Sequence, residues 1–224
     1  MMSSLLSDGY QIIRQLLDSQ AVKNLTQVVS NSLQTDSNYG VRNLHYKISV
    51  VNKLATSQEL IDYLSQYTNF PQFRLIKAIY FNKTKRDNWS VPWHQDKTIA
   101  VKNKVLIPNY KNWTVKQGVP HVQPPLEVLT KLTAIRIALD DSDINNGGLK
   151  IIPQTHNLGI LDSKAIEQIT QRQTPLSLSL KAGDVLMMHP LILHSSPKSI
   201  SDNSRRVIHL EYSSGKLASE LAWY

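Results

Sequence analysis

The sequence contains no cysteine, which narrows the chemistry open to this chain. Disulfide bonds, thiolate metal sites, iron–sulfur clusters and cysteine nucleophiles are all excluded. A metal ion bound here must therefore be held by histidine or carboxylate side chains, which leaves seven histidines and 17 acidic residues as candidates.

Long hydrophobic runs are also absent. No stretch reaches about 18 apolar residues, so no membrane span is expected. The N-terminus reads MMSSLLSDGYQIIRQLL and has no basic segment, no sustained apolar segment and no small-residue cleavage site. No signal peptide is predicted from this pattern, and a cytoplasmic location is the expectation.

Acidic residues are scarce relative to basic ones, 17 against 25, which gives a net charge of +8. The basic residues are spread along the chain without Lys/Arg runs or basic–aromatic repeats, so nucleic acid is not expected as a partner. Two interpretations of the charge stay open. It is either a solvated basic surface or a positive field around a pocket for an anionic small molecule.

The remaining composition is that of a globular protein, with 41% hydrophobic and 19% charged residues over a length of 224. This length predicts a single domain over residues 1–224. Apolar residues at helical spacing predict a helix over 21–33, preceded by cap residues at 18 and 19, and a second helix over 57–64. The N-terminal third is therefore expected to be helical, although 10–17 fits either a short strand or the start of a helix.

Short apolar runs separated by turn residues follow after Pro71 and indicate strands. They are RLIKAIYFN, VPWHQD, TIAVKN, LTAIRIALDD, GLKIIP, LSLSL, DVLMMHPLILHS and RRVIHLEYS. Such a series is typical of a β-sandwich or barrel, so the expected fold class is mainly β with flanking helices (α+β) around a jelly-roll core. Residues 97–131 contain several prolines and are expected to form a long loop, as a lid or an insertion.

A metal site is indicated by the segment Trp93-His94-Gln95-Asp96. Residues two apart on a strand face the same side, so His94 and Asp96 can point together into the interior. The segment MMHPLILHSSP offers His189 or His194 as the third ligand. Two histidines and one carboxylate form the facial arrangement that suits Fe(II) and leaves coordination positions open.

A strand-borne arginine supports a 2-oxoglutarate site near this metal. Arg205 follows the second histidine closely, and arginine binds carboxylates, such as the distal one of 2-oxoglutarate, in a bidentate manner. Arg206 lies next to it. Strand alternation places the two side chains on opposite faces, so only one of them can serve the pocket.

These segments together resemble the phytanoyl-CoA dioxygenase family of Fe(II)- and 2-oxoglutarate-dependent oxygenases. The matching stretches are NWSVPWHQD, RIALDDSDINNGGLKIIPQTH, KAGDVLMMHPLILHSS and SRRVIHLEY. The resemblance covers nearly the whole chain and implies a double-stranded β-helix (jelly-roll, cupin-like) core. It also implies His194 rather than His189 as the metal ligand, Arg205 rather than Arg206 as the 2-oxoglutarate residue, and Ser196 as a second contact of the same carboxylate.

The resemblance further implies the activity. The expected function is an Fe(II)- and 2-oxoglutarate-dependent dioxygenase that uses O2 to hydroxylate a small organic substrate, with release of succinate and CO2. His94, Asp96 and His194 are then the catalytic and metal-binding residues. Because Asp96 is retained where halogenating relatives carry a small residue, hydroxylation is favoured over halogenation. Alternatives are a non-catalytic metal- or ligand-binding jelly roll and a nucleic-acid-modifying oxygenase.

Several other polar residues are assigned secondary roles. The family's Pro-Gly-Ser-His turn reads PQTH here, and its His156 is expected to be structural, like the Asp140–Asp141 pair. Arg136 stands where the family often carries an aromatic residue and is expected to alter the pocket wall. Lys77 is a candidate for the pocket wall, whereas His121 and His209 are expected to be structural.

Overall fold

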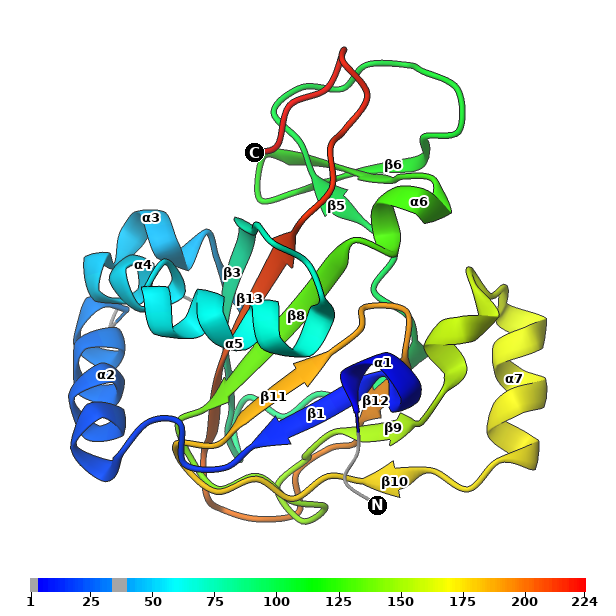
Figure 1. Cartoon of the computed structure of the whole chain (residues 1–224). Helices are drawn as coiled ribbons and strands as arrows, with labels where there is room; N and C mark the ends of the chain where they lie inside the picture. Colours follow the sequence, from blue (N-terminus) through cyan, green and yellow to red (C-terminus); the bar gives the residue numbers. More distant parts are fainter. Residues whose placement is uncertain (1–3, 34–39) are drawn as a thin grey trace.

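The core consists of two antiparallel β-sheets (Figure 1). Residues of both sheets line a central cavity. The computed structural model describes residues 4–33 and 40–224. The larger sheet has the strand order β1-β11-β8-β13-β3-β2 and the smaller one β10-β9-β12-β4. Every pairing within these two sheets is antiparallel. The expected jelly-roll core, mainly β with flanking helices, is therefore confirmed.

The bounds of these strands are as follows. The larger sheet contains β1 (Tyr10–Ile13), β2 (Val41–Arg42), β3 (Arg74–Lys83), β8 (Leu132–Ala138), β11 (Val185–Met188) and β13 (Arg205–Ser213). The smaller sheet contains β4 (Val91–His94), β9 (Lys150–Ile152), β10 (Leu176–Ser177) and β12 (Leu193–Ser196). Apart from β1 and β2, these strands fall within the predicted apolar runs to within a residue, and β2 was not predicted.

Strand alternation gives the larger sheet one face toward the cavity and one toward a layer of helices. On β3, Lys77, Ile79 and Phe81 line the cavity, whereas Ala78 and Tyr80 pack in the hydrophobic core beneath the helices. The central strand β13 pairs with β3 on one side and β8 on the other, so these three strands present a continuous inner face. Residues two apart on them reach the same cavity.

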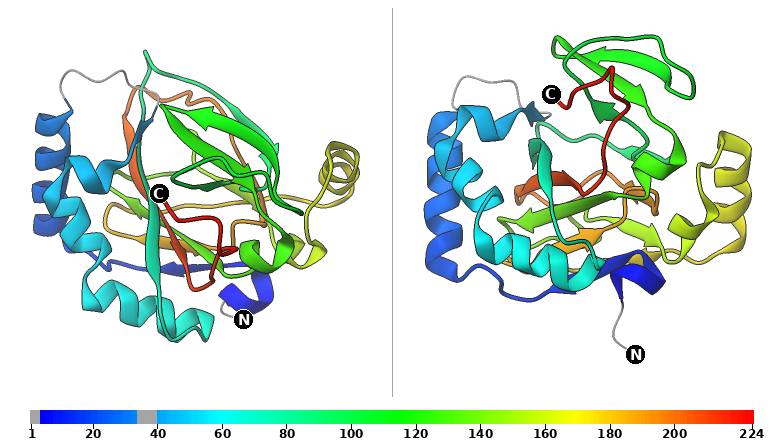
Figure 2. Two further views of the ribbon diagram at one scale, coloured as in Figure 1. Left: turned by 90° about the horizontal axis from the view of Figure 1, so that it is seen from above. Right: turned by 45° about the horizontal axis from the view of Figure 1, so that its top comes forward.

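Helices from the N-terminal part cover the outer face of this sheet (Figure 2). They are α1 (Leu5–Asp8), α2 (Ser19–Ser32), α3 (Leu44–Lys47), α4 (Ser49–Ala55) and α5 (Gln58–Thr68). The Asp18 carboxylate accepts a hydrogen bond of 2.7 Å from the Ala21 N–H and caps α2. The helices predicted over 21–33 and 57–64 are confirmed, with ends shifted by a few residues.

The N-terminal third is not helical throughout, so that part of the expectation is not confirmed. Residues Tyr10–Ile13 form β1, which pairs with Val185–Met188 of β11, and β2 pairs with β3. The ambiguous segment 10–17 thus begins as a strand. Pairing with a strand some 175 residues away decides its conformation, which local periodicity does not reveal.

The segment 97–131 forms a small sheet of its own, which corrects the expectation of a long loop. Its strands are β5 (Ile99–Ala100), β6 (Lys111–Lys116) and β7 (Val119–Gln123), in the order β5-β7-β6, and the helix α6 (Leu126–Leu129) follows. We call these three strands the lid sheet. It lies beyond the ends of β3 and β13, at the top of Figure 1, so it can close one end of the cavity.

The remaining elements are a 3₁₀ turn, Thr155–Leu158, and the helix α7 (Ser163–Arg172), which stands apart from the sheets (Figure 1). Asp162 caps α7 by accepting from the Ala165 N–H at 2.8 Å. None of the helices within residues 4–33 and 40–224 combines the length and hydrophobicity that a bilayer crossing requires.

Candidate metal centre

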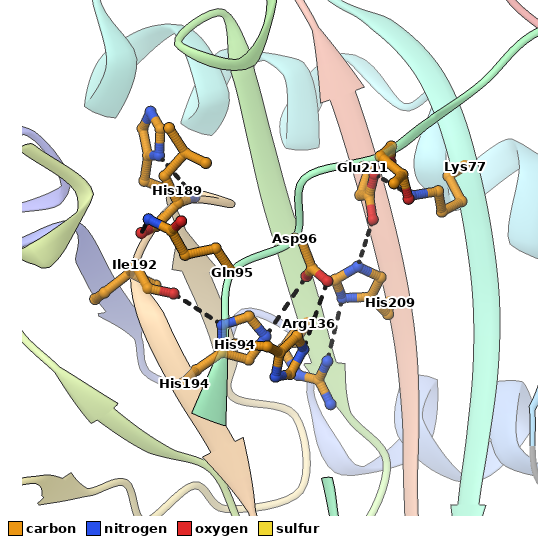
Figure 3. A network of polar contacts seen from close by, with 12 residues as sticks. Lys77, His94, Gln95, Asp96, Arg136, His189, Ile192, His194, His209 and Glu211 are labelled. Atoms are coloured by element: carbon orange, nitrogen blue, oxygen red, sulfur yellow. Dashed lines mark hydrogen bonds and ion pairs between the residues drawn. The ribbon is translucent and has the colours of Figure 1, made fainter. Parts of the chain in front are cut away.

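Two neighbouring strands of the smaller sheet bring the two predicted histidine ligands together. β4 and β12 are paired so that His94 lies directly opposite His194, with ring centroids 4.1 Å apart. Asp96 follows two residues after His94, and its backbone N–H donates to the Pro190 carbonyl at 2.8 Å. Figure 3 shows the three side chains turned toward one another, beside the inner face of the larger sheet.

The three side chains offer one ligand atom each, all within 4.8 Å of one another. His94 Nε2 lies 3.7 Å from one Asp96 oxygen, and His194 Nε2 lies 3.5 Å from the other. The His194 side chain is 5% exposed, whereas those of His94 and Asp96 are about one third exposed, so the cluster opens toward the cavity. This donor set, two imidazoles and one carboxylate on one side, fits a metal ion with open positions on the other.

The protonation of both rings suits metal binding. His94 Nδ1–H donates to the Pro92 carbonyl at 2.8 Å, and His194 Nδ1–H donates to the Ile192 carbonyl at 2.9 Å. A carbonyl oxygen only accepts, so the proton is held on Nδ1 and the Nε2 lone pair is free to bind a metal. Burial lowers the pKa of His194 to about 4, which keeps this ring neutral near pH 7.

Gln95 anchors the segment between His94, the last residue of β4, and Asp96. Its amide Nε2 donates to the carbonyls of Gly159 and Leu191, each at 2.8 Å, and its Oε1 accepts from the Leu161 N–H at 2.9 Å. The side chain therefore points away from the cavity, as alternation requires for a residue between two inward-facing ones (Figure 3). All three hydrogen bonds hold the backbone that carries His94 and Asp96.

The carboxylate of Asp96 is held in its charged form. Burial by itself raises its pKa, but the nearby His194 and His94 rings, together with His209 and Lys77, outweigh that effect and lower the pKa. Asp96 is thus an anion that balances part of the positive charge of the cavity.

The inner end of the cavity contains two buried cations that no described carboxylate pairs with. Arg205 is 3% exposed, and its Nε is buried with no hydrogen-bond partner in residues 4–33 and 40–224. Lys83 is directly opposite it on β3, fully buried, and donates to Ser196 Oγ at 2.8 Å and to the Pro197 carbonyl at 2.6 Å. Ser196 in turn donates to the Gly147 carbonyl at 2.8 Å.

Both cations are in an electrostatically unfavourable position. Burial, with the neighbouring Arg205 and Arg136 charges, lowers the pKa of Lys83 to about 7. Burial and the Arg136 charge lower the pKa of Arg205 to about 9, against a smaller opposite effect of Asp140. A buried charge without an ionic partner destabilises the protein, so this end of the cavity fits an anion. Lys83 was not predicted as a site residue from the sequence, although it lies six residues after Lys77 and should therefore face the same side of a strand.

A second polar network lies on the inner face of the larger sheet, beside Asp96 (Figure 3). Arg136 donates to His209 Nδ1 at 3.2 Å, His209 Nε2 lies 3.1 Å from the Glu211 carboxylate, and Lys77 Nζ contacts the same carboxylate at 2.5 Å. Asp96, His209 and Glu211 also lie within 4.8 Å of one another. However, His209 is already hydrogen-bonded to Arg136, and Glu211 is already paired with Lys77. His94, Asp96 and His194 are therefore the better metal site.

Several predicted residues lie outside the cavity. Arg206 faces the opposite side of β13 from Arg205 and binds Asp140 through two hydrogen bonds, Nε at 2.8 Å and Nη2 at 2.6 Å. Asp141 accepts from Lys181 at 2.7 Å. Both aspartates thus have structural partners, and Arg206 is engaged away from the cavity.

Three other histidines, His121, His156 and His189, have local partners. His189 accepts from the Leu191 N–H at 3.0 Å and points away from the metal cluster (Figure 3). His156 lies 3.2 Å from the Leu6 carbonyl, and His121 lies 3.0 Å from the Val119 carbonyl on β7. None of the three reaches the cluster of His94, Asp96 and His194.

The model of the phytanoyl-CoA dioxygenase (PhyH) family matches residues 5–207, which include His94, Asp96, His194 and Arg205. The chain belongs to the phytanoyl-CoA dioxygenase family. The resemblance predicted from the sequence motifs is thereby confirmed.

Solved structures with the same fold agree with membership of the phytanoyl-CoA dioxygenase family. EctD from S. alaskensis, with 2-oxoglutarate and 5-hydroxyectoine, has a TM-score of 0.73 and 17% identity over 94% of this chain and 73% of that one. SnoK, a non-haem α-ketoglutarate-dependent carbocyclase from nogalamycin biosynthesis, has a TM-score of 0.72 and 15% identity, covering 93% and 81%. HygX from Streptomyces hygroscopicus, with nickel and 2-oxoglutarate bound, has a TM-score of 0.66 and 15% identity, covering 93% and 83%. At these identities the likeness shows a shared fold. No curated protein sequence matches the chain.

Proposed function

We propose that the chain is an Fe(II)- and 2-oxoglutarate-dependent oxygenase that oxidises a small organic substrate, with residues 1–224 acting as one domain. The observation that carries the proposal is a His-Asp-His cluster in the same cavity as Arg205, a buried cation whose Nε has no partner in the described residues, with the buried Lys83 opposite it on β3. When bound, iron with 2-oxoglutarate and O2 supplies the oxidising chemistry and yields succinate and CO2. A cytoplasmic location belongs to the same proposal and is tested by cell fractionation.

Iron is assigned to Nε2 of His94, Nε2 of His194 and the carboxylate of Asp96. The backbone carbonyls of Pro92 and Ile192 fix the two rings, so the donor atoms are oriented before metal arrives. These residues can contribute only one side of the coordination sphere, which leaves room for a chelating 2-oxo acid and O2.

The distal carboxylate of 2-oxoglutarate is assigned to Arg205, Lys83 and Ser196. The unpartnered Nε of Arg205 supports this assignment, because a buried guanidinium ordinarily has an anionic partner. Lys83 adds a second positive charge, and its hydrogen bond to Ser196 Oγ holds the hydroxyl beside it. These groups bind and orient the cosubstrate; none of them needs to transfer a proton.

The network of Arg136, His209 and Glu211 is assigned to the wall that supports the metal site. Arg136 is buried beside Asp96, and the attraction of that carboxylate partly offsets the burial that lowers the pKa of Arg136 to about 10. A fixed cation beside a metal-binding carboxylate keeps it ionised and limits its rotation.

The alternative of a non-catalytic metal-binding jelly roll is less well supported, because a metal binder does not need buried cations next to the ligands. A nucleic-acid-modifying oxygenase is less well supported for a different reason. Arg205 and Lys83, the buried cations without an ion-pair partner in the described residues, are enclosed in the protein and cannot form part of an exposed basic stripe.

Anaerobic titration of Fe(II) and then 2-oxoglutarate into the metal-free protein tests the proposal. We expect a visible charge-transfer band of the iron–2-oxoglutarate chelate, saturating at one equivalent of each. His94→Ala should abolish the band. Arg205→Ala should keep iron binding but weaken 2-oxoglutarate at least tenfold, since a charge-assisted bidentate contact contributes about 1.5–3 kcal/mol.

Arg206→Ala is the matched control, because it removes the same side chain from the adjacent position that faces Asp140. It should leave the band and the 2-oxoglutarate affinity unchanged. Iron binding without a band would refute the 2-oxoglutarate assignment and favour the metal-binding jelly roll, and absence of iron binding would refute the triad.

A further inference from the structure

The cavity has a second group of cations at its other end, which the proposed cosubstrate site leaves unused. Lys77 lines the cavity from β3, and Lys83 lies six residues further along the same strand, about 20 Å away, where it contacts the cavity-lining Ser196. The metal cluster lies between them, beside His209 on β13. We call the end near Lys77 the lid end, because β3 and β13 approach the lid sheet there (Figure 1).

Three basic side chains line the lid end. Arg42, on the edge strand β2, is paired with Ile79 of β3 and therefore shares its inward face. Lys116 comes from the end of β6 in the lid sheet, and its Nζ lies 3.5 Å from Thr98 Oγ1. Lys77 donates to the Thr98 carbonyl at 3.3 Å. The three charges are close enough that Arg42 and Lys77, after burial, lower the pKa of Lys116.

The carboxylates nearest these charges are already engaged. Glu211 is buried and accepts from Lys77 at 2.5 Å, with His209 on its other oxygen, and Asp96 belongs to the metal cluster. Both carboxylates raise the pKa of Arg42 and of Lys116 by their charge alone. Within residues 4–33 and 40–224, Arg42 has no hydrogen bond or ion pair and Lys116 has only the weak contact with Thr98. Two half-buried cations thus line the cavity with no carboxylate in direct contact.

2-Oxoglutarate cannot serve both ends of the cavity. A five-carbon dicarboxylate is only about 6 Å long, far less than the separation of Lys83 and Lys77 along β3. With its distal carboxylate at Arg205 and Lys83, the cosubstrate stops at the metal. The cations at the lid end are therefore available to a different molecule, which approaches the metal from the opposite side.

We propose that Arg42 and Lys116 bind an anionic group, a carboxylate or phosphate, of the molecule that the metal centre oxidises. This inference rests on the proposed function and narrows its substrate class to small organic acids. Arg42 supplies a planar fork that matches either oxyanion, and Lys116 supplies a point charge. Since Lys116 belongs to the lid sheet and Arg42 to the main sheet, one bound anion would connect the two.

Calorimetry with charged and neutral probes of equal size tests this inference. The anaerobic protein is saturated with Fe(II) and 2-oxoglutarate and then titrated with benzoate, phenyl phosphate or the neutral benzamide. At least one anion should bind and benzamide should not, and the tighter anion identifies the preferred oxyanion. Arg42→Gln and Lys116→Gln should each weaken the anion about tenfold or more, because each removes a charge-assisted contact.

Arg86→Gln and Lys104→Gln are the matched controls, since they remove the same charges from exposed positions. They should bind the anion like the wild type, and all four variants should show an unchanged 2-oxoglutarate charge-transfer titration, which also verifies folding. Equal binding of benzoate, phenyl phosphate and benzamide, or undiminished anion binding in both Arg42→Gln and Lys116→Gln, would overturn the inference. So would a loss of 2-oxoglutarate affinity in Arg42→Gln.

Failure of the proposed function gives a different result. In that case no charge-transfer band forms, and the probes are titrated into the metal-free protein. Anion binding that Arg42→Gln and Lys116→Gln weaken, but Arg205→Ala does not, would support the anion site independently of iron. Anion binding that depends only on Arg205 would refute it.

Discussion

Lys83 shows how a single residue acquires a role from its surroundings. On the sequence it is a polar residue at the end of a strand, where a lysine usually reaches solvent. In the structure it is fully buried opposite Arg205, and its pKa falls to about 7. Near neutral pH the side chain therefore exists in both protonation states, and only the charged state attracts an anion.

Binding of 2-oxoglutarate should consequently depend on pH through Lys83. The free protein loses the lysine proton as the pH rises above about 7, whereas the bound dianion requires it. We expect the 2-oxoglutarate affinity of the metal-loaded protein to fall by roughly tenfold per pH unit between pH 7 and 8.5. The charge-transfer titration, repeated anaerobically across this range, measures the effect.

Lys83→Met isolates the contribution of this residue. It should bind 2-oxoglutarate more weakly than the wild type at pH 6.5 and should show a much flatter pH dependence up to pH 8.5. A variant that kept the steep wild-type dependence would assign the titration to another group. Lys85→Met, at an exposed position two residues on, serves as the control.

At the scale of secondary-structure elements, the site depends on how β4 and β12 are held together. The register places His94 opposite His194, and Gln95 fixes the chain between His94 and Asp96 through three hydrogen bonds. A shift of one residue in this pairing would turn the ligands to the opposite face. Gln95, which does not bind the metal, is therefore as constrained in position as His94 and Asp96 on either side of it.

Gln95→Ala should disturb both stability and metal binding. It leaves the carbonyls of Gly159 and Leu191 without their donor in a buried region, which costs about 2–4 kcal/mol of unfolding free energy. Iron affinity should fall as well, because the backbone of residues 94–96 gains freedom. Urea unfolding and Fe(II) titration measure the two effects. Gln27→Ala on the exposed face of α2 should change neither, and an unaffected Gln95→Ala would show that Asp96 is positioned by other contacts.

The sequence predicted the elements whose pattern is local. The apolar runs of β3, β8, β11 and β13 and the periodicity of α2 and α5 were found in their correct places because each has a continuous buried face. The metal motif was recognised because His94 and Asp96 are two residues apart in the sequence, although β4 ends at His94 and Asp96 lies just beyond it. Arg205, Arg206 and Ser196 were assigned from the family resemblance, and their geometry agrees with the assigned faces.

Other elements could not be predicted because their conformation depends on distant partners. The strand β6 is largely exposed and reads as polar, so it lacks the alternation that marks a strand. The helix α7 was also missed: its sequence is amphipathic, but it has no buried residue. Arg42 and Lys116 come close only when β2 pairs with β3 and the lid sheet, which carries Lys116, packs at the end of the cavity. No spacing in the sequence relates them.

At the scale of the whole molecule, the excess of positive charge is partly internal. The cavity is lined by Arg42, Lys77, Lys116, Arg136 and Arg205, with Lys83 at its inner end, against Asp96 and Glu211. Burying cations without anions lowers stability, and proteins commonly retain such destabilising groups where they bind ligands. Without ligands, the wild type should therefore be less stable than a variant in which an apolar residue replaces a buried cation. With ligands bound, the wild type should be the more stable of the two.

Arg205→Met tests this balance. At pH 7 we expect the ligand-free variant to melt at a higher temperature than the wild type, because a buried unpaired charge is replaced by an apolar chain of similar length. With Mn(II), an air-stable substitute for Fe(II), present for both proteins, 2-oxoglutarate near 100 times its wild-type dissociation constant should add about 2.7 kcal/mol to the wild type, or roughly 5–10 °C. The variant, which binds 2-oxoglutarate at least tenfold more weakly, should gain about 1.4 kcal/mol or less from it. The order of the two melting temperatures should therefore reverse.

Arg206→Met provides the contrasting control in the same thermal-shift measurement. It breaks the paired hydrogen bonds to Asp140 on the opposite face of β13, so it should lower the melting temperature with and without ligands and leave the ligand-induced gain intact. If Arg205→Met instead behaved like Arg206→Met, its guanidinium would be a structural partner of the fold. Reversal in one variant and a constant offset in its neighbour would show that two adjacent arginines stabilise different states of the same protein.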